Sequence, residues 1–159
     1  MKLKILLVLG LGAVLLPILM VRSTRPPALG LEGGRLRPCP ESPNCVCSQS
    51  TEASSRIAPL AFQGDPAAAF ASLIEFLEAE PRVTLEEVGT TYAHAVFRTR
   101  FLRFRDDVEF LLDPEAHVIH VRSASRIGYS DLGKNRERVE DLRSRWRAPG
   151  GPGTLKPLR

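Results

Sequence analysis

The chain has 159 residues, of which 43% are hydrophobic and 25% charged, and its formal net charge is +4. At about 100–200 residues per domain, this length predicts one domain with short appendages. The hydrophobic content excludes a wholly disordered chain. A multi-pass membrane protein is excluded as well, because only one stretch of the sequence is long and apolar enough to span a bilayer. Basic residues are dispersed and interleaved with acidic ones, which argues against nucleic acid as a partner.

The N-terminus has the composition of a membrane anchor. Lys2 and Lys4 precede an uncharged, mostly aliphatic run over residues 5–21, and such a run just suffices to span a bilayer, since the lower limit is about 17 residues. A signal peptide begins in the same way, but no small-x-small cleavage site follows directly. We predict that residues 1–22 anchor the protein in the cell envelope, with the domain on the non-cytoplasmic side. The alternative is a cleaved signal and a secreted or periplasmic protein.

Residues 23–55 predict a tether with a Cys-containing loop, because Pro, Gly and Arg occur there without periodicity. Cys39, Cys45 and Cys47 lie close together in it. An exported protein meets oxidising conditions, which favours a local disulfide and leaves one Cys free or intermolecular. Zinc usually takes four ligands from paired C-x₂₋₄-C elements, so the C-x₅-C-x-C spacing is a poor match. We expect neither a metal site nor a cofactor.

The folded domain is predicted over residues 56–147. Residues 57–62 form a short strand, which Pro59 confines to an edge of the sheet. Asp65 and Pro66 then predict the N-cap and first turn of a helix with one apolar stripe. This helix ends at Pro81, and residues 83–88 form the next strand.

Three further strands are predicted from alternating side chains and two turns, at Arg105-Asp106 and at residues 113–116. In this register Phe101 pairs with Phe110, and Leu112 pairs with His117. The same register sets His120 opposite Glu109 and Arg122 opposite Asp107. One face of the sheet is then hydrophobic, and the other carries Arg100, Asp107, Glu109, His120 and Arg122.

A last helix is expected to start at Ser130 or Asp131, and residues 148–159 form a disordered tail. Its predicted buried stripe consists of Leu132, Val139, Leu142 and Trp146. The order β-α-β-β-β-β-α predicts an α+β fold, with an antiparallel sheet of about four to five strands. Both helices cover its apolar face.

Two segments carry a resemblance to a known family. The first is Cys39-Pro-x-Ser-Pro-Asn-Cys45-Val; the second runs from Asp106-Asp-Val-Glu-Phe to Asp131-Leu-Gly-x-Asn135-Arg. Together they resemble the uncharacterised bacterial family named domain of unknown function 1499 (DUF1499), from about Cys39 to Trp146. The resemblance implies no activity, cofactor or catalytic residue. Because the family usually has a small Ser-like residue in place of Cys47, it favours Cys39–Cys45 as the disulfide.

The densest group of polar residues lies on the polar sheet face and in the connection to the last helix. Its members are Arg100, Glu109, His120, Arg122, Ser125, Arg126, Tyr129, Asp131, Asn135 and Arg136. One interpretation is a solvated face with cross-strand pairs worth about 0.2–1 kcal/mol each. The other is a site where arginines and the helix start hold an anion. On this basis we predict a membrane-tethered, non-catalytic envelope domain that binds an anionic small molecule, a lipid head group or a protein partner.

An enzyme is the alternative interpretation, and we expect it less. A small envelope hydrolase could use His120 with Ser125, which lies beyond the predicted strand end. Ser123 is an odd number of residues from His120 on the same strand, so the two side chains point to opposite faces. The sequence contains neither a G-x-S-x-G elbow nor an H-E-x-x-H motif.

Overall fold

The computed structural model describes Pro26 and residues 28–146. The predicted anchor over residues 1–22 and the predicted tail over residues 148–159 lie outside this part of the chain. Within residues 26 and 28–146, no helix has the length and apolar character needed to cross a membrane.

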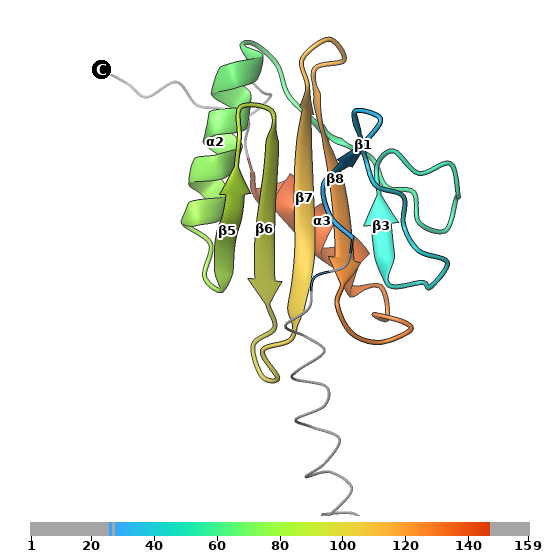
Figure 1. The fold of residues 1–159 in the computed structure, drawn as a ribbon. Coiled ribbons are helices and arrows are strands. Elements are labelled where there is room, and N and C mark those ends of the chain that lie inside the picture. Colours follow the sequence, from blue (N-terminus) through green and yellow to red (C-terminus); the bar gives the residue numbers. More distant parts are fainter. Residues whose placement is uncertain (1–25, 27, 147–159) are drawn as a thin grey trace, which may run out of the picture.

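The body is an antiparallel six-stranded sheet with two helices (Figure 1). The sheet order is β3-β8-β7-β6-β5, and β4 pairs with the same edge of β8 that β3 extends. The strands of this sheet are β3 (Cys45–Cys47), β4 (Leu60–Ala61), β5 (Val83–Val88), β6 (Tyr92–Arg98), β7 (Arg105–Asp113) and β8 (Val118–Ser125). The helices are α2 (Pro66–Glu78) and α3 (Lys134–Arg145), and a small hairpin is formed by β1 (Leu31–Glu32) and β2 (Arg35–Leu36).

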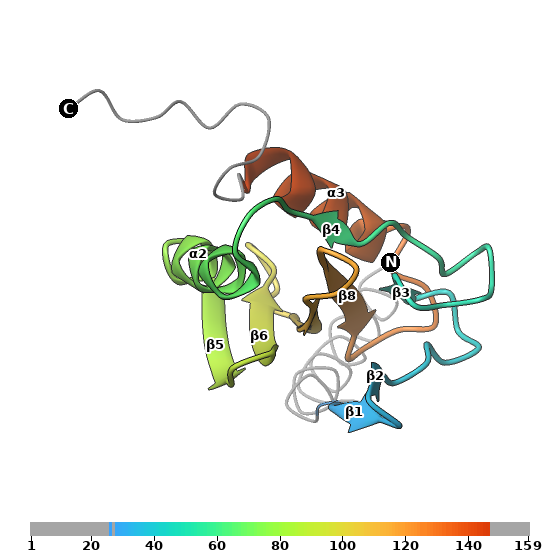
Figure 2. The same cartoon turned by 90° about the horizontal axis from the view of Figure 1, so that it is seen from above.

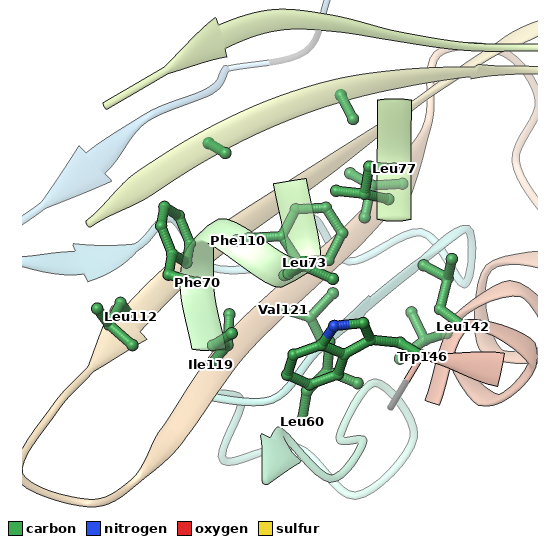
Figure 3. Close-up of a cluster of buried hydrophobic side chains, with 14 of the residues drawn as sticks. Leu60, Phe70, Leu73, Leu77, Phe110, Leu112, Ile119, Val121, Leu142 and Trp146 are labelled. Atoms are coloured by element: carbon green, nitrogen blue, oxygen red, sulfur yellow. The ribbon is translucent and has the colours of Figure 1, made fainter. Parts of the chain in front are cut away.

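The predicted α+β fold is confirmed. Both helices cover one face of the sheet, and the β1–β2 hairpin lies on the opposite side (Figure 2). Side chains from both helices and the central strands form the main core between them (Figure 3). Phe110, Val121 and Leu73 are fully buried there, and each such side chain contributes about 1.5–3 kcal/mol by leaving water.

Helix α2 begins as its sequence predicts. The Asp65 carboxylate accepts a hydrogen bond from the Ala68 N–H at 2.8 Å, and Pro66 occupies the first turn. This bond satisfies one of the N–H groups that a helix start leaves without an intrahelical partner.

The β7–β8 hairpin differs from the predicted register by two residues. Leu112 pairs with Ile119 instead of His117, and Glu109 therefore faces Arg122 instead of His120. The cause is a longer turn, in which the Asp113 carboxylate accepts from Ala116 N–H and His117 takes a left-handed φ of 51°. Because the shift is an even number, every side chain keeps its predicted face.

The β6–β7 hairpin differs more. Phe110 pairs with Ala93 instead of Phe101, and β6 ends at Arg98. Residues 99–104 form a loop that is closed by hydrogen bonds between Thr99 and Phe104, namely Thr99 N–H to the Phe104 carbonyl and Phe104 N–H to Thr99 Oγ1, both at 2.9 Å. The shift of eight residues again preserves the faces, but it leaves Phe101 exposed at the loop tip.

Three smaller predictions are corrected. The strand predicted over residues 57–62 is reduced to Leu60–Ala61. Helix α3 starts at Lys134, because Leu132 and Gly133 have φ values of 55° and 81° that no right-handed helix allows; Leu132 is consequently exposed instead of buried. Residues 45–47, predicted as part of the tether, form the edge strand β3.

Candidate functional site

The polar face of the sheet is buried, contrary to the prediction of a solvated face. Asp107 and Glu109 are fully buried, and Arg122 is 3% exposed. The segment around β1 and β2 covers this face, where Leu36 packs with Cys47 and Leu111 in a second hydrophobic cluster. The charged residues here are therefore sealed inside the protein.

Glu109 on β7 joins three parts of the chain. Its Oε2 accepts from Arg122 Nη1 on β8 at 2.6 Å, and its Oε1 accepts from the Tyr92 hydroxyl on β6 at 2.8 Å. The same Oε1 accepts from the backbone N–H of Gly30 at 2.6 Å. Glu109 thus fastens the N-terminal segment to the sheet with charge-assisted hydrogen bonds.

Asp107 makes the equivalent arrangement two residues earlier. Arg126 binds both carboxylate oxygens, with Nε at 2.8 Å and Nη2 at 2.7 Å, and His94 Nε2 lies 2.8 Å from Oδ1. We call Tyr92, His94, Asp107, Glu109, Arg122 and Arg126 the buried ionic network. Both carboxylates of this network accept hydrogen bonds from other groups of the protein, so the network stabilises the fold.

Burial and pairing shift the pKa values of this network in opposite directions. Burial, and then the neighbouring negative charge of Glu109, raise the pKa of Tyr92, so its hydroxyl stays a donor. Burial alone would raise the pKa of Asp107, but hydrogen bonds from His94 and Arg126 outweigh it and hold that pKa below its ordinary value.

A second network attaches the start of α3 to β3 and β8. The Asn135 amide group donates to the Asn44 carbonyl at 2.8 Å and to Ser125 Oγ at 3.0 Å. Asp131 accepts from the N–H groups of Gly133 and Asn135 at 3.0 and 2.6 Å and so caps α3. The two segments that carry the family resemblance meet here, through Asn44 and Asn135.

His120 has a serine partner, but it is Ser48 and not Ser125. Strand β8 continues through Ser125, so alternation places Ser125 on the α3 side, where it bonds Asn135. Ser48 Oγ lies 3.1 Å from His120 Nδ1, and His120 Nε2 lies 3.7 Å from the Asp113 carboxylate. Burial lowers the pKa of His120 in spite of Asp113, and a hydrogen bond joins its Nδ1 to the Ser48 hydroxyl.

In this structure the Ser48–His120–Asp113 arrangement lacks the hydrogen bond between base and carboxylate that a catalytic triad has. The 3.7 Å separation is longer than a hydrogen bond, and Ser48 Oγ already accepts from the Val121 N–H at 2.9 Å. Neither Ser48 nor His120 lines either of the two cavities described below. The hydroxyl therefore ties the segment after β3 to β8.

The remaining predicted site residues are dispersed. Arg100 lies in the exposed β6–β7 loop with its guanidinium over the Phe101 ring, and Tyr129 is 76% exposed in the loop before α3. Arg136 donates to the backbone carbonyls of Ser54 and Arg56 at 3.0 and 2.9 Å. The ten predicted residues thus belong to separate places instead of one site.

A groove of about 730 Å³ lies beside the second network. This volume is within the range of ligand pockets, about 300–1,000 Å³. One wall is the loop closed by the Cys39–Cys45 disulfide, another consists of residues 49–52, 54 and 55, and Asp131, Gly133 and Arg136 contribute from the start of α3. The disulfide predicted from the resemblance is confirmed, and Cys47 is a buried free thiol that lines the groove.

The groove is acidic at its rim. Glu32, Glu41 and Glu52 are exposed there, whereas the two arginines of the lining donate to backbone carbonyl groups, Arg35 to that of Gln49 and Arg136 to those of Ser54 and Arg56. Proline rings and the disulfide supply apolar surface between them. This chemistry suits a partner with basic and apolar side chains better than an anion.

A second cavity of about 320 Å³ lies between the segment that follows α2, helix α3 and the ends of β5 and β6. Its charged groups are largely paired with each other, as in the ion pairs of Arg145 with Glu80 and of Arg138 with Asp106. Within the described residues, His, Cys, Asp and Glu side chains form no group of three that could hold a metal ion.

Sequence reasoning missed Tyr92, His94, Gly30 and Ser48 as partners of the polar face. Tyr92 and His94 alternate along β6 in phase with Asp107 and Glu109, so the period of two was a usable signal. Gly30 and Ser48 contribute from segments without periodicity, and the sequence gives no sign of their contacts.

The comparisons with known proteins agree with the resemblance stated above. Neither a curated protein nor a solved structure matches this chain. One family model, described as Protein of unknown function (DUF1499), matches residues 35–145. This match takes in the disulfide, the sheet, both helices and all but the first wall residue of the groove. The chain therefore belongs to the DUF1499 family.

Proposed function

We propose that this protein is a membrane-tethered, non-catalytic domain of the cell envelope that binds a segment of a protein partner in the groove. The membrane tether of this proposal is the predicted anchor, whose apolar run over residues 5–21 lies outside the described residues. A disulfide between Cys39 and Cys45 supports a location in an oxidising compartment.

The observation that carries this proposal is the groove itself. Both segments that resemble the family contribute to its walls, through Cys39–Cys45 on one side and Asp131 and Arg136 on the other. The disulfide and the Asn135 hydrogen bonds hold these walls in place before any partner arrives. Such preorganisation lowers the entropy that binding has to overcome.

The charges of the groove indicate the kind of partner. The predicted binding of an anionic ligand at the sheet face is not supported, because Arg122 and Arg126 form ion pairs with Glu109 and Asp107. The exposed Glu41 and Glu52 instead attract basic side chains, and like-charge repulsion discourages acidic ones. An extended polypeptide with basic and apolar residues is the best match.

Photo-crosslinking in cells that produce the full chain tests this proposal. A benzophenone amino acid replaces Ser42, which lines the groove, or Glu86, which is exposed on β5 away from it. We expect an adduct of defined mass from position 42 and none of that mass from position 86. Glu52→Lys should weaken the adduct, and the matched Glu86→Lys should leave it unchanged.

Two results would contradict the proposal. Equal adducts from positions 42 and 86 would show that the groove is not the binding surface. Labelling of Ser48 by a fluorophosphonate probe would show an activated serine and contradict the non-catalytic assignment. If an alkaline wash released the full chain from membranes, the membrane attachment would be contradicted, and the proposed binding in the groove would not be affected.

A further inference from the structure

We propose that the end of the sheet where β6 ends and β7 begins docks on an anionic lipid bilayer. This surface, called the loop end, consists of the β6–β7 loop (residues 99–104) with its flanking arginines and of residues 126–133, which connect β8 to α3. It borders the groove, which Asp131 and Gly133 also line, but its exposed hydrophobic side chains lie outside that lining. The inference rests on the tether of the proposed function, and it adds a second membrane contact.

Exposed hydrophobic side chains gather at the loop end. In the described chain the large exposed ones are Leu31, Val88, Phe101, Leu102, Tyr129 and Leu132. The last four belong to the two loops, which both lie below the sheet in Figure 1. The two loops are adjacent, because Arg126 N–H donates to the Arg105 carbonyl at 3.4 Å. Phe101 is 87% exposed and Leu132 is 90% exposed. A cluster of exposed hydrophobic side chains at one end of a protein marks a surface that binds a protein or a membrane.

Positive charge surrounds these side chains. Residues 98–105 contain four arginines and no acidic residue. Arg82 is exposed and adjacent, because the Arg98 N–H donates to its carbonyl at 2.9 Å. The carboxylates that follow, Asp106 and Asp107, are compensated by Arg138 and Arg126. An apolar tip within a ring of arginines matches a bilayer interface with anionic head groups.

The start of the described chain places the bilayer at this end. The apolar run stops at residue 21, and the described chain begins at Pro26. At about 3.5 Å per residue, the connection spans at most about 18 Å. In Figure 1 the first described residues enter beside β7 from the side of the loop end and run up to β1. A connection this short holds the body close to the bilayer with the loop end nearest to it.

Depth-dependent fluorescence quenching of the full chain in vesicles tests the inference. The vesicles contain phosphatidylcholine with or without phosphatidylglycerol, and bromine atoms on the acyl chains quench nearby tryptophans. Phe101→Trp reports on the loop end, and the matched Val88→Trp reports on the opposite end of the sheet, where residue 88 is 52% exposed. The single native Trp146, 5% exposed, gives the same background in each variant.

We expect brominated lipid to quench Phe101→Trp and to leave Val88→Trp at the background. In the Phe101→Trp variant, the further changes Arg100→Gln and Arg103→Gln should lower the ratio of membrane-docked to undocked protein about 30-fold in vesicles that contain phosphatidylglycerol. Arg35→Gln, on β2, should have no effect. Equal quenching at residues 101 and 88 would overturn the inference, and quenching that ignores phosphatidylglycerol would overturn its anionic part.

The tether is measured separately on the same vesicles by an alkaline wash. If the chain remains in the pellet and Phe101→Trp is not quenched, the tether stands and docking of the loop end is wrong. If the chain is released but Phe101→Trp is quenched in the unwashed vesicles, docking stands and the tether of the proposed function is wrong.

Discussion

At the scale of single residues, the polar face of the sheet is explained by two carboxylates. Glu109 and Asp107 are fully buried, and an isolated charge in such a position would cost several kcal/mol. Each one is compensated by an arginine, from Arg122 and Arg126, and by a further donor, from Tyr92 and His94. Removing one partner therefore leaves the other buried and charged without its ion pair.

A double-mutant cycle on Glu109 and Arg122 measures this dependence. Glu109→Leu should lower the free energy of unfolding by about 3–5 kcal/mol, because Arg122 stays buried and charged. Glu109→Leu with Arg122→Leu should cost clearly less than the sum of the single changes. Urea unfolding followed by Trp146 fluorescence gives the values, and the exposed Glu86→Ala should change them by no more than about 0.5 kcal/mol. Additive losses would show that the pair does not interact.

The lowered pKa of Asp107 makes part of the stability depend on pH. The folded protein holds Asp107 ionised below the ordinary value of 3.8, so the unfolded chain binds more protons in this range. This contribution is complete above the ordinary pKa and is lost as the pH falls through the folded pKa. Asp107→Asn should lower stability at neutral pH and flatten its decline in acid. A variant that keeps the full acid dependence would contradict this role.

At the scale of elements, the alternation of side chains was predictable and the pairing of strands was not. Phe110 and Ala95 keep their predicted face because both register shifts are even. The shifts arise in the loops between the strands, where Arg103 and His117 adopt left-handed φ values. The alternation of side chains along the strands does not predict these values. Strand β3 escaped prediction because Cys45–Cys47 is too short to show a pattern.

The candidate site was predictable only in its parts. The resemblance implied Cys39–Cys45 as the disulfide, which is confirmed, whereas the predicted helix start at Ser130 or Asp131 lies three or four residues before the observed one at Lys134. The groove combines segments that lie far apart in the chain, and the contact between Asn44 and Asn135 that joins them spans 91 residues. Local patterns carry no information about such a contact.

The disulfide loop gives a prediction at this scale. Cys39→Ser with Cys45→Ser should lower the free energy of unfolding by about 2 kcal/mol, because a short closed loop no longer restricts the unfolded chain. A reductant should lower the free energy of unfolding of the wild-type protein by a similar amount and leave that of the double variant unchanged. The buried Cys47 provides the control, since burial raises the pKa of its thiol and it should resist alkylation in both folded proteins. Unchanged stability on removal of the disulfide would contradict its role as a wall of the groove.

At the scale of the whole molecule, three surfaces have different roles. The polar sheet face is sealed by the N-terminal segment and holds the body together. The groove at the outer edge beyond β3 is open and acidic, and the loop end is basic with exposed hydrophobic side chains. The proposed function follows from this division, because only surfaces that water reaches are available to a partner or a bilayer.

Carboxyl footprinting of the folded full chain tests this division most directly. A carbodiimide with an added amine modifies accessible carboxylates, and mass spectrometry reads the rate at each position. We predict rapid modification of Glu41 and Glu52 at the groove and protection of Asp107 and Glu109 until the protein unfolds. Modification of Asp107 and Glu109 as fast as that of Glu41 would show an open sheet face and contradict the account.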